Sequence, residues 1–335
     1  MNALIIKEVI GYENVNKRFE EAKIMFIEMK KILKEIIEGK KWLDRDTKDR
    51  IIKKVNDITY YDKIYNDYHN LTNVEKLYEL LIYGKKQNYF FIKMYTKFFK
   101  ELIENSLPEG YEGYIIEILT DNASYFTRSF KIFTLLGYML EPIFDTHFMI
   151  PMKYGSLGSI LGHEILHSLD HSNLGIISKY TSGEILSEYS RKEYNIRRQC
   201  LVDQYSKYDV RLPGTKIDGV ATYDENLSDN SGLKLAYKAY KRYQEKYGSD
   251  KNKINGFTRY SNDQLFFISY AHSFCSKVTD EKKMEIINKK VYHLPSDLRI
   301  IISIGNQKEF SNAFNCKIGS VMNPKDKCEV WKVKH

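Results

Sequence analysis

The sequence has no run of about 18 apolar residues, the length that a helix needs to cross a bilayer. Its first eight residues, Met1 to Glu8, are too short and too soon charged to form the apolar core of a secretory leader. No internal repeat and no low-complexity segment is evident. Taken literally, the chain as given is expected to be soluble and not exported.

The sequence also lacks a concentrated patch of charge of one sign. It has 52 Lys and Arg against 44 Asp and Glu, a net charge of +8. The basic residues occur as pairs spread along the chain, such as Lys30-Lys31, Lys85-Lys86 and Lys282-Lys283. Spread pairs usually solvate helix faces, whereas a nucleic-acid site gathers its positive charge on one face. The pattern disfavours a nucleic-acid binder, which would show salt-sensitive retention on a polyanion column.

Cysteine is scarce, and none of it has the C-x-x-C spacing of a zinc ribbon. The four cysteines lie in the last two fifths of the chain, at Cys200, Cys275, Cys316 and Cys328. Four cysteines allow three pairings, and the residues alone do not choose among them. Buried free thiols are an equally simple reading.

At 335 residues the chain is long enough for one large core or two joined lobes. Its first hundred residues have the apolar spacing of helices. One stripe ends near Gly39, a second helix follows the capping groups of Asp44 to Asp46, a third starts after Thr72 or Asn73, and a fourth covers the aromatic run 89–99. Aromatic residues at helical spacing are usually core residues.

The helical pattern stops at Leu107-Pro108-Glu109-Gly110, and two extended stretches are expected beyond it. These are a strand over 114–125 and a segment over 144–150 that is stopped by Pro151. Further helices are expected at the histidine motif described below, and at 187–208, 227–247 and 263–276. The sequence therefore predicts a mainly α protein with a small mixed β-sheet, in the α+β class.

The segment from Gly162 to Asp170 carries the pattern His-Glu-x-x-His. Two histidines four apart on a helix point from one face, so His163 and His167 can share one metal ion. Glu164, next to a ligand, is placed to take a proton from water and to pass it to a leaving amine. Asp170 lies on the same face and can orient the His167 ring. A chance match is the alternative, because the pattern is short.

A second acidic motif runs from Asp224 to Asp229. Glu225 could be a third protein ligand, and three ligands leave the fourth zinc position open, as in catalytic rather than structural sites. Asp229, one turn later, could accept the free N–H of His163. Alone, these carboxylates could simply favour the positive end of a helix. Together the two motifs favour a zinc hydrolase.

Two residues near the C-terminus complete the candidate set. His293 could stabilise the oxyanion that forms when water attacks a carbonyl, and Arg299 could hold a carbonyl or carboxylate of the substrate. Taken alone, an isolated histidine and arginine are more often surface or packing residues.

These motifs, in this order, resemble those of the neprilysin and endothelin-converting-enzyme family of zinc metallopeptidases. The similarity extends over nearly the whole chain, in blocks at 42–48, 122–125, 137–144, 154–170, 225–233, 264–275, 293–299, 309–324 and 328–331. Ser124 departs from the aromatic residue of the Asn-Ala-aromatic-Tyr block, and Lys153 replaces the usual Asn.

The resemblance implies a thermolysin-like zincin catalytic domain over 113–335 and a partial helical lobe over 1–112. It implies one zinc ion per chain, bound by His163, His167 and Glu225, with Glu164 as general base and acid. Asp170 and Asp229 would support the ligands, and His293 would stabilise the transition state. Asn122 and Ala123 would hold the peptide as an added edge strand, with Arg299 on its backbone. Asp229 and His293 thus count with Glu164 as candidate catalytic residues.

The implied activity is hydrolysis of short peptides on the amino side of hydrophobic residues. The alternative is a catalytically weak or inactive truncated homologue that binds zinc or peptide. The resemblance also implies a Cys200–Cys328 disulfide, and partners for Cys275 and Cys316 in an N-terminal half.

Members of the family are about twice as long and are type II membrane or secreted proteins. A truncated gene model is therefore expected, with a compact variant of the family as the alternative, and an extracellular or cell-surface location is expected as well. The glycosylation patterns at Asn122 and Asn226, which would obstruct the site, are expected to be unused.

Overall fold

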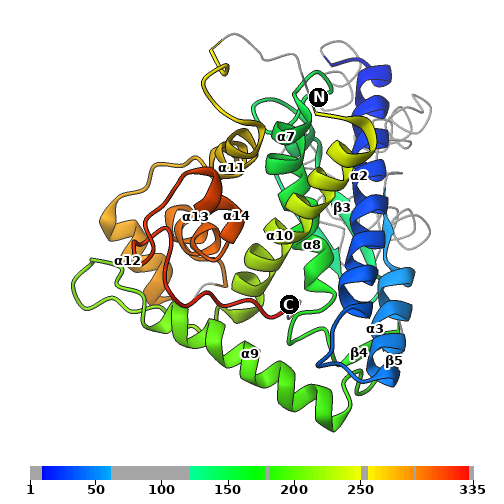
Figure 1. Cartoon of the computed structure of the whole chain (residues 1–335), viewed down its shortest axis with the longest axis vertical. Helices are drawn as coiled ribbons and strands as arrows, with labels where there is room; N and C mark the ends of the chain where they lie inside the picture. The colour runs from blue at the N-terminus through cyan, green and yellow to red at the C-terminus, as the bar shows by residue number, and fades with distance from the viewer. Residues whose placement is uncertain (1–9, 62–120, 179–180, 250–255, 290–291, 332–335) are drawn as a thin grey trace, which may run out of the picture.

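The computed structural model describes residues 10–61, 121–178, 181–249, 256–289 and 292–331. These residues are mainly helical with a small mixed sheet, which confirms the α+β prediction (Figure 1). The helical elements are α2 (Tyr12–Glu38), α3 (Arg45–Asp57), η4 (Leu136–Met139), α7 (Ile150–Lys153), η5 (Tyr154–Gly158), α8 (Ser159–His167), α9 (Glu188–Ser206), α10 (Tyr223–Tyr247), α11 (Asn262–Ser273), α12 (Asp280–Asn288), α13 (Ser296–Gly305) and α14 (Lys308–Ala313).

The expected helices that lie in these ranges are confirmed. The apolar stripe of α2 is buried and the helix ends at Gly39, as predicted. Asp44 is the N-cap of α3, and its carboxylate accepts from the backbone N–H of Thr47. Helix α10 begins at Tyr223, one turn before the predicted start, so Glu225 lies within its first turn. The helices expected after Thr72 and over 89–99, and the boundary at 112/113, lie outside the described residues.

The strands are β1 (Thr59–Tyr60), β2 (Ala123–Phe126), β3 (Lys131–Thr134), β4 (Ile176–Ser178) and β5 (Thr181–Ser182). In the larger sheet β3 is central, parallel to β1 and antiparallel to β2, with Ala123 opposite Thr134. Strand β2 is therefore an edge of the sheet among the described residues. An edge strand presents backbone groups to which a further strand can bond.

The expected extended segment over 144–150 is wrong. The chain there makes turns, because the Asp145 carboxylate accepts from the backbone N–H of His147 and the Phe144 N–H returns to the Leu140 carbonyl. Arg18 of α2 holds these turns by bonding to the Phe144 carbonyl and to Asp145. Pro151 begins a short helix rather than stopping a strand. Strand β3, which we did not expect from the sequence, supplies the partner of β2 instead.

The centre of the molecule is the contact between α8 and α10, with α2 on one side and α11 to α14 on the other (Figure 1). Two glycines set the distance between these helices. A Cβ atom on Gly162 would lie 2.5 Å from the Gly232 carbonyl oxygen, and one on Gly232 would lie 2.5 Å from the His163 nitrogen. The two backbones can touch only because neither residue has a side chain.

Replacing Gly232 by alanine is expected to push α10 away from α8 and to lower both stability and metal affinity. Forced overpacking of this kind costs about 1–3 kcal/mol or more. The measurement is thermal unfolding together with a zinc titration. Gly39→Ala is the matched control, because a Cβ there meets its nearest neighbour, the Glu35 carbonyl oxygen, at 3.4 Å, an ordinary contact at the end of α2. Equal stability and equal zinc affinity in the two variants would contradict the prediction.

The start of α3 is bonded to the start of α9. Besides capping α3, the Asp44 carboxylate accepts from the hydroxyls of Ser187 and Ser190. Burial raises the pKa of Asp44, but these hydroxyls and the Thr47 N–H outweigh it and hold the pKa well below its usual range. The N-terminal helices are thereby joined to the part of the chain that follows the histidine motif.

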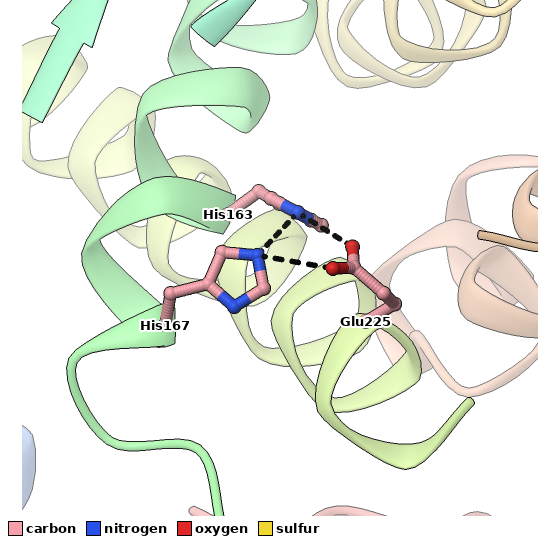
Figure 2. A group of neighbouring side chains, drawn as sticks. All are labelled: His163, His167 and Glu225. Atoms are coloured by element: carbon pink, nitrogen blue, oxygen red, sulfur yellow. Dashed lines mark hydrogen bonds and ion pairs between the residues drawn. The ribbon is translucent and has the colours of Figure 1, made fainter. Parts of the chain in front are cut away.

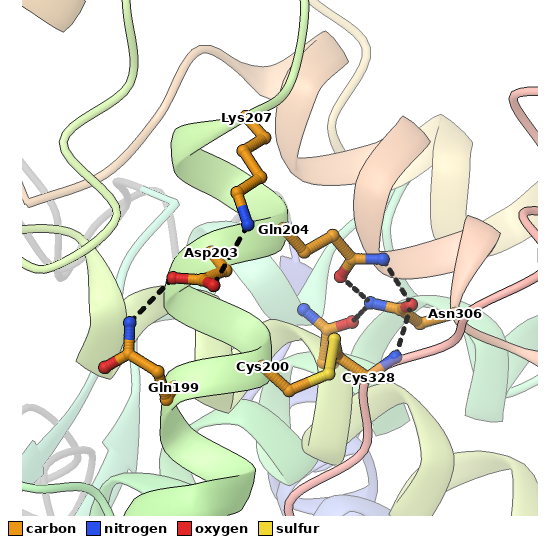
Figure 3. The surroundings of a disulfide bond; sticks show 8 residues. Gln199, Cys200, Asp203, Gln204, Lys207, Asn306 and Cys328 are labelled. Atoms are coloured by element: carbon orange, nitrogen blue, oxygen red, sulfur yellow. Dashed lines mark hydrogen bonds and ion pairs between the residues drawn. A yellow bond between two sulfur atoms is a disulfide. The ribbon is translucent and has the colours of Figure 1, made fainter.

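Cys200 and Cys328 form a disulfide that ties α9 to the C-terminal segment, with a Cα–Cα distance of 5.7 Å (Figure 3). The polar surroundings are shared with α13, because Asn306 and Gln204 exchange two hydrogen bonds of 2.7 and 2.9 Å. Asn306 also accepts from the backbone N–H of Cys328. The disulfide expected from the family resemblance is confirmed, and Cys275 and Cys316 are free thiols. Among the described helices, none has the length and apolarity needed to cross a membrane.

Candidate active site

His163, His167 and Glu225 lie together between α8 and α10 (Figure 2). The two histidines project from one face of α8, and their Nε2 atoms are 2.9 Å apart. Glu225 reaches them from the first turn of α10, with oxygens 3.2 Å from His163 Nε2 and 3.6 Å from His167 Nε2. One ligand atom from each residue lies within 4.8 Å of the other two. The close contact of α8 with α10 is what brings the two sequence motifs into one site.

The other ring nitrogen of each histidine faces a carboxylate. His163 Nδ1 lies 2.9 Å from Asp229 Oδ1, and His167 Nδ1 lies 2.9 Å from Asp170 Oδ2. The Ser228 hydroxyl is a further neighbour of His167 Nδ1, at 3.2 Å. A carboxylate only accepts, so each Nδ1 is assigned the proton and each Nε2 carries a lone pair. This tautomer is the one that binds a metal through Nε2.

The site therefore gathers acceptors that need a cation. Two Nε2 lone pairs and the Glu225 carboxylate face one another, and without a positive charge between them they repel. Burial lowers the pKa of His163, but hydrogen bonds to Asp229 and Glu225 outweigh it and raise the pKa to about 10. The site thus favours positive charge, whether from a proton or from a metal ion. Two imidazoles and one carboxylate are a ligand set that zinc prefers.

Asp229 is held from its other side by Arg299 of α13. The guanidinium donates two hydrogen bonds, of 2.8 and 2.6 Å, to the two carboxylate oxygens. Burial raises the pKa of Asp229, but the charge and hydrogen bonds of Arg299 outweigh it and lower the pKa to about 2. Asp229 thus stays ionised while it faces His163. The Arg299 guanidinium also stacks over the Phe274 ring, 4.8 Å from its centroid.

A cavity of about 90 Å³ opens beside this cluster. The residues proposed for catalysis and substrate binding all border it, namely Asn122, Ala123, Glu164, Asp229, His293 and Arg299. His293 stands at its edge with 54% of its side chain exposed, and its Nε2 lies 2.8 Å from Glu225 Oε2. Glu164 is 7% exposed. Every candidate residue from the sequence is therefore at this site or supports a residue there.

Sequence reasoning missed several residues of the site. Tyr138, Tyr270 and Phe274 line the cavity and give it aromatic walls. Each lies inside or beside a block that we matched to the family, but an aromatic residue among core aromatics carries no separate signal. Sequence reasoning also missed the structural role of Asp224. Its carboxylate accepts hydrogen bonds from the His171 backbone N–H and the Ser172 hydroxyl, which join α10 to the turn after α8.

Asn226 is 2% exposed, and its amide donates to the Thr222 hydroxyl at 2.8 Å. The folded chain does not present this asparagine for glycosylation. Asn122 is partly exposed at the start of β2.

A helix-borne His-Glu-x-x-His pattern, with a glutamate from a second helix facing both rings, is the arrangement of a zincin, the class of metallopeptidases to which thermolysin belongs. Comparison with known sequences agrees, because the profile of peptidase family M13 matches residues 122–330. This chain belongs to peptidase family M13.

Curated relatives match over most of the chain. Neprilysin-1 of Caenorhabditis elegans is 31% identical over 324 residues, which cover 92% of this chain and 41% of the relative. Endothelin-converting enzyme 1 of Cavia porcellus is 30% identical over 321 residues, covering 92% of this chain and 40% of the relative. The chain thus spans about two fifths of the length of the curated relatives it matches.

Solved structures show the same fold. The cryo-EM structure of the Mycobacterium tuberculosis zinc metalloprotease Zmp1 in its open state superposes with a TM-score of 0.74 at 21% identity. The match covers 99% of this chain and 51% of that one. PepO from Lactobacillus rhamnosis superposes with a TM-score of 0.69 at 19% identity, covering 98% of this chain and 49% of that one.

Proposed function

We propose that this protein is a zinc-dependent endopeptidase that binds one zinc ion per chain through His163, His167 and Glu225. The observation that carries the proposal is the convergence of these side chains, 3.2 and 3.6 Å apart across α8 and α10, beside a cavity that Glu164 borders. Zinc, when bound, supplies a Lewis acid that polarises the scissile carbonyl and lowers the pKa of water. Membership of a peptidase family supports the same function.

The chain's own residues then have separate tasks. Glu164, nearly buried beside the ligands, takes a proton from the attacking water and delivers it to the leaving amine. His293, half-exposed at the edge of the cavity, donates to the oxyanion as it forms. Asp229 and Asp170 keep the two imidazoles in the tautomer that binds metal.

The substrate proposed is a short peptide bound as an extra strand along β2, which is an edge of the larger sheet among the described residues. Asn122 and Ala123, at the start of β2, border the same cavity as Glu164, so a strand added there passes the site. Arg299 borders the same cavity and donates to Asp229 through Nε and Nη2. In this proposal the N–H groups that do not bond Asp229 donate to a carbonyl of the peptide. The aromatic walls of the cavity suit a hydrophobic residue, and from the resemblance to the family we propose cleavage on the amino side of that residue.

The disulfide supports an oxidising compartment, and with the family relationship we propose an extracellular or cell-surface location. We also propose that the catalytic domain covers residues 113–335 and that the preceding helices belong to a helical lobe. The relatives named neprilysin and endothelin-converting enzyme support the proposed location, and the family profile over residues 122–330 supports a catalytic domain in this part of the chain.

The second candidate function is a protein that binds zinc or peptide without turnover. The observation that supports it is the cluster of His163, His167 and Glu225 itself, because these ligands suffice to bind a metal ion without turnover. One experiment separates the two. The purified chain is incubated with an internally quenched peptide that contains a hydrophobic residue, with and without a chelator, and its zinc content is measured.

The endopeptidase proposal expects cleavage that a chelator stops and that added zinc restores, with about one zinc per chain. Zinc at that stoichiometry without cleavage would favour the binding protein. Cleavage that the chelator does not change would refute both proposals, and mass spectrometry of the products locates the cleaved bond.

A further inference from the structure

Lys54 of α3 is a buried lysine outside the two helices that carry the proposed ligands. It is 1% exposed, and its ammonium lies over the Phe130 ring, 5.3 Å from the centroid. It makes no ion pair with any residue in the described ranges. A buried ammonium is costly unless its N–H groups are bonded. Lys54 therefore needs a structural reason for its position.

The Lys54 ammonium is bonded to the backbone of the turn that follows the histidine motif. The Lys54 ammonium donates to the Asn173 carbonyl and, at 2.8 Å, to the Ile176 carbonyl. The Asn173 carbonyl also accepts from the Ile176 N–H at 3.0 Å, so Lys54 binds both ends of one turn. Burial lowers the pKa of Lys54 to about 8, although the nearby charge of Asp170 raises it, so the side chain is mostly charged at neutral pH.

Asn173 connects this turn to the metal site. Its backbone N–H donates to Asp170 Oδ1 at 2.7 Å, and its side-chain amide reaches both Asp170 oxygens at 3.0 and 3.1 Å. Asp170 in turn faces His167 Nδ1 at 2.9 Å. Asn173 and Asp170 are 8% and 2% exposed. A continuous, buried chain of hydrogen bonds thus runs from α3 to a proposed zinc ligand.

The same segment is held on its other side by α10. Asp224, next to Glu225, accepts from the His171 backbone N–H at 2.9 Å and from the Ser172 hydroxyl. The turn that carries Asp170 is therefore fixed at its start by the helix of one ligand and at its end by Lys54. Loss of Lys54 would remove a donor from the buried Asn173 carbonyl and from the part-buried Ile176 carbonyl, and would free that end of the turn.

We propose that Lys54 is a positioning residue of the metal site, which acts through Asn173 and Asp170 to fix the ring of His167. The inference rests on the proposed function in one respect, that His167 binds zinc. It goes further in making α3, which lies in the proposed helical lobe, a determinant of metal affinity. Outer partners of metal-bound histidines typically contribute 10- to 100-fold to affinity.

The test is Lys54→Met, which removes the charge and the donors and keeps an apolar side chain of similar length. Zinc affinity is measured on the full chain by competition with a chromophoric chelator, and cobalt(II) is added in place of zinc to record the visible spectrum. We expect zinc to bind about 10-fold more weakly. We also expect a shifted cobalt spectrum, because its bands report the geometry of the ligands and a change in general stability alone would not move them.

Lys40→Met is the matched control. Lys40 is the chain's other fully buried lysine in the described ranges, at 0% exposure, and its ammonium makes no hydrogen bond there. It lies after α2 and outside the path to Asp170. This variant is expected to keep the zinc affinity and the cobalt spectrum of the parent chain.

A double-mutant cycle tests the path itself. In the Asp170→Ala background, which lacks the carboxylate that links the turn to His167, Lys54→Met should cost much less affinity than in the parent chain. Should Lys54→Met fail to fold, Lys54→Gln replaces it; because its amide keeps two N–H donors but no charge, we expect a smaller loss of zinc affinity together with a shifted cobalt spectrum.

Zinc affinity and a cobalt spectrum unchanged by loss of Lys54 would overturn the inference while leaving the proposed function intact. Fully additive effects in the cycle would do the same. A parent chain that binds no zinc in the same titration would overturn both.

Discussion

Glu164→Gln is expected to keep zinc at the parent stoichiometry and to lower peptide turnover by about 100- to 10,000-fold, the range that a general acid–base residue contributes. The substitution keeps the size of the side chain and one carbonyl oxygen, but an amide takes up no proton from water. Glu164 is nearly buried beside the proposed ligands and borders the cavity. Among the described residues that line this cavity, Asp229 is the only other carboxylate. Arg299 and His163 already engage Asp229, which leaves the proton transfer to Glu164.

The measurement is the rate of cleavage of the quenched peptide, with zinc content determined on the same samples. Glu188→Gln on α9 is the control, since 85% of the Glu188 side chain is exposed and its ion pair with Lys192 lies on the surface. Parent-like turnover by the Glu164 variant would refute its role as general base. Loss of zinc together with turnover would instead make Glu164 necessary for the metal site.

Glu225→Ala is expected to weaken zinc binding by at least about 100-fold, the upper end of what a supporting residue contributes. The reason is electrostatic as well as geometric. Among the described residues Glu225 is the one carboxylate in contact with the Nε2 atoms of both histidines, and its removal leaves two neutral imidazoles to hold a divalent cation. Burial raises the pKa of Glu225, but its contacts with His163 and His293 outweigh it and keep the carboxylate ionised.

Zinc affinity is again measured by chelator competition, and cleavage is expected to be lost at zinc concentrations that saturate the parent chain. Glu309→Ala is the control, because Glu309 is a partly buried carboxylate paired with Lys234 at 2.7 Å, away from the site. Full zinc affinity in the Glu225 variant would mean that the third ligand lies elsewhere, and the proposed site would have to be abandoned.

Local patterns predicted the helices well where an apolar stripe and its capping residues agreed. The stripe of α2 ends at Gly39, and Asp44 caps α3, because these signals act within one or two turns of chain. The segment over 144–150 failed for the opposite reason. A short apolar run does not distinguish a strand from a buried turn, and the bonds from Arg18, 126 residues away from Phe144, decide the matter.

The sequence by itself determined that His163 and His167 share one face of a helix, because four residues make about one turn, and that Glu164 stands beside them. It also determined the family, through motifs in a fixed order. Only the tertiary structure decided that Glu225 reaches both rings, since that depends on Gly162 and Gly232 letting two helix backbones touch. The hydrogen bonds from Arg299 to Asp229 and from Lys54 to the Asn173 carbonyl were decided there too, because contacts between distant segments follow no regular spacing in the sequence.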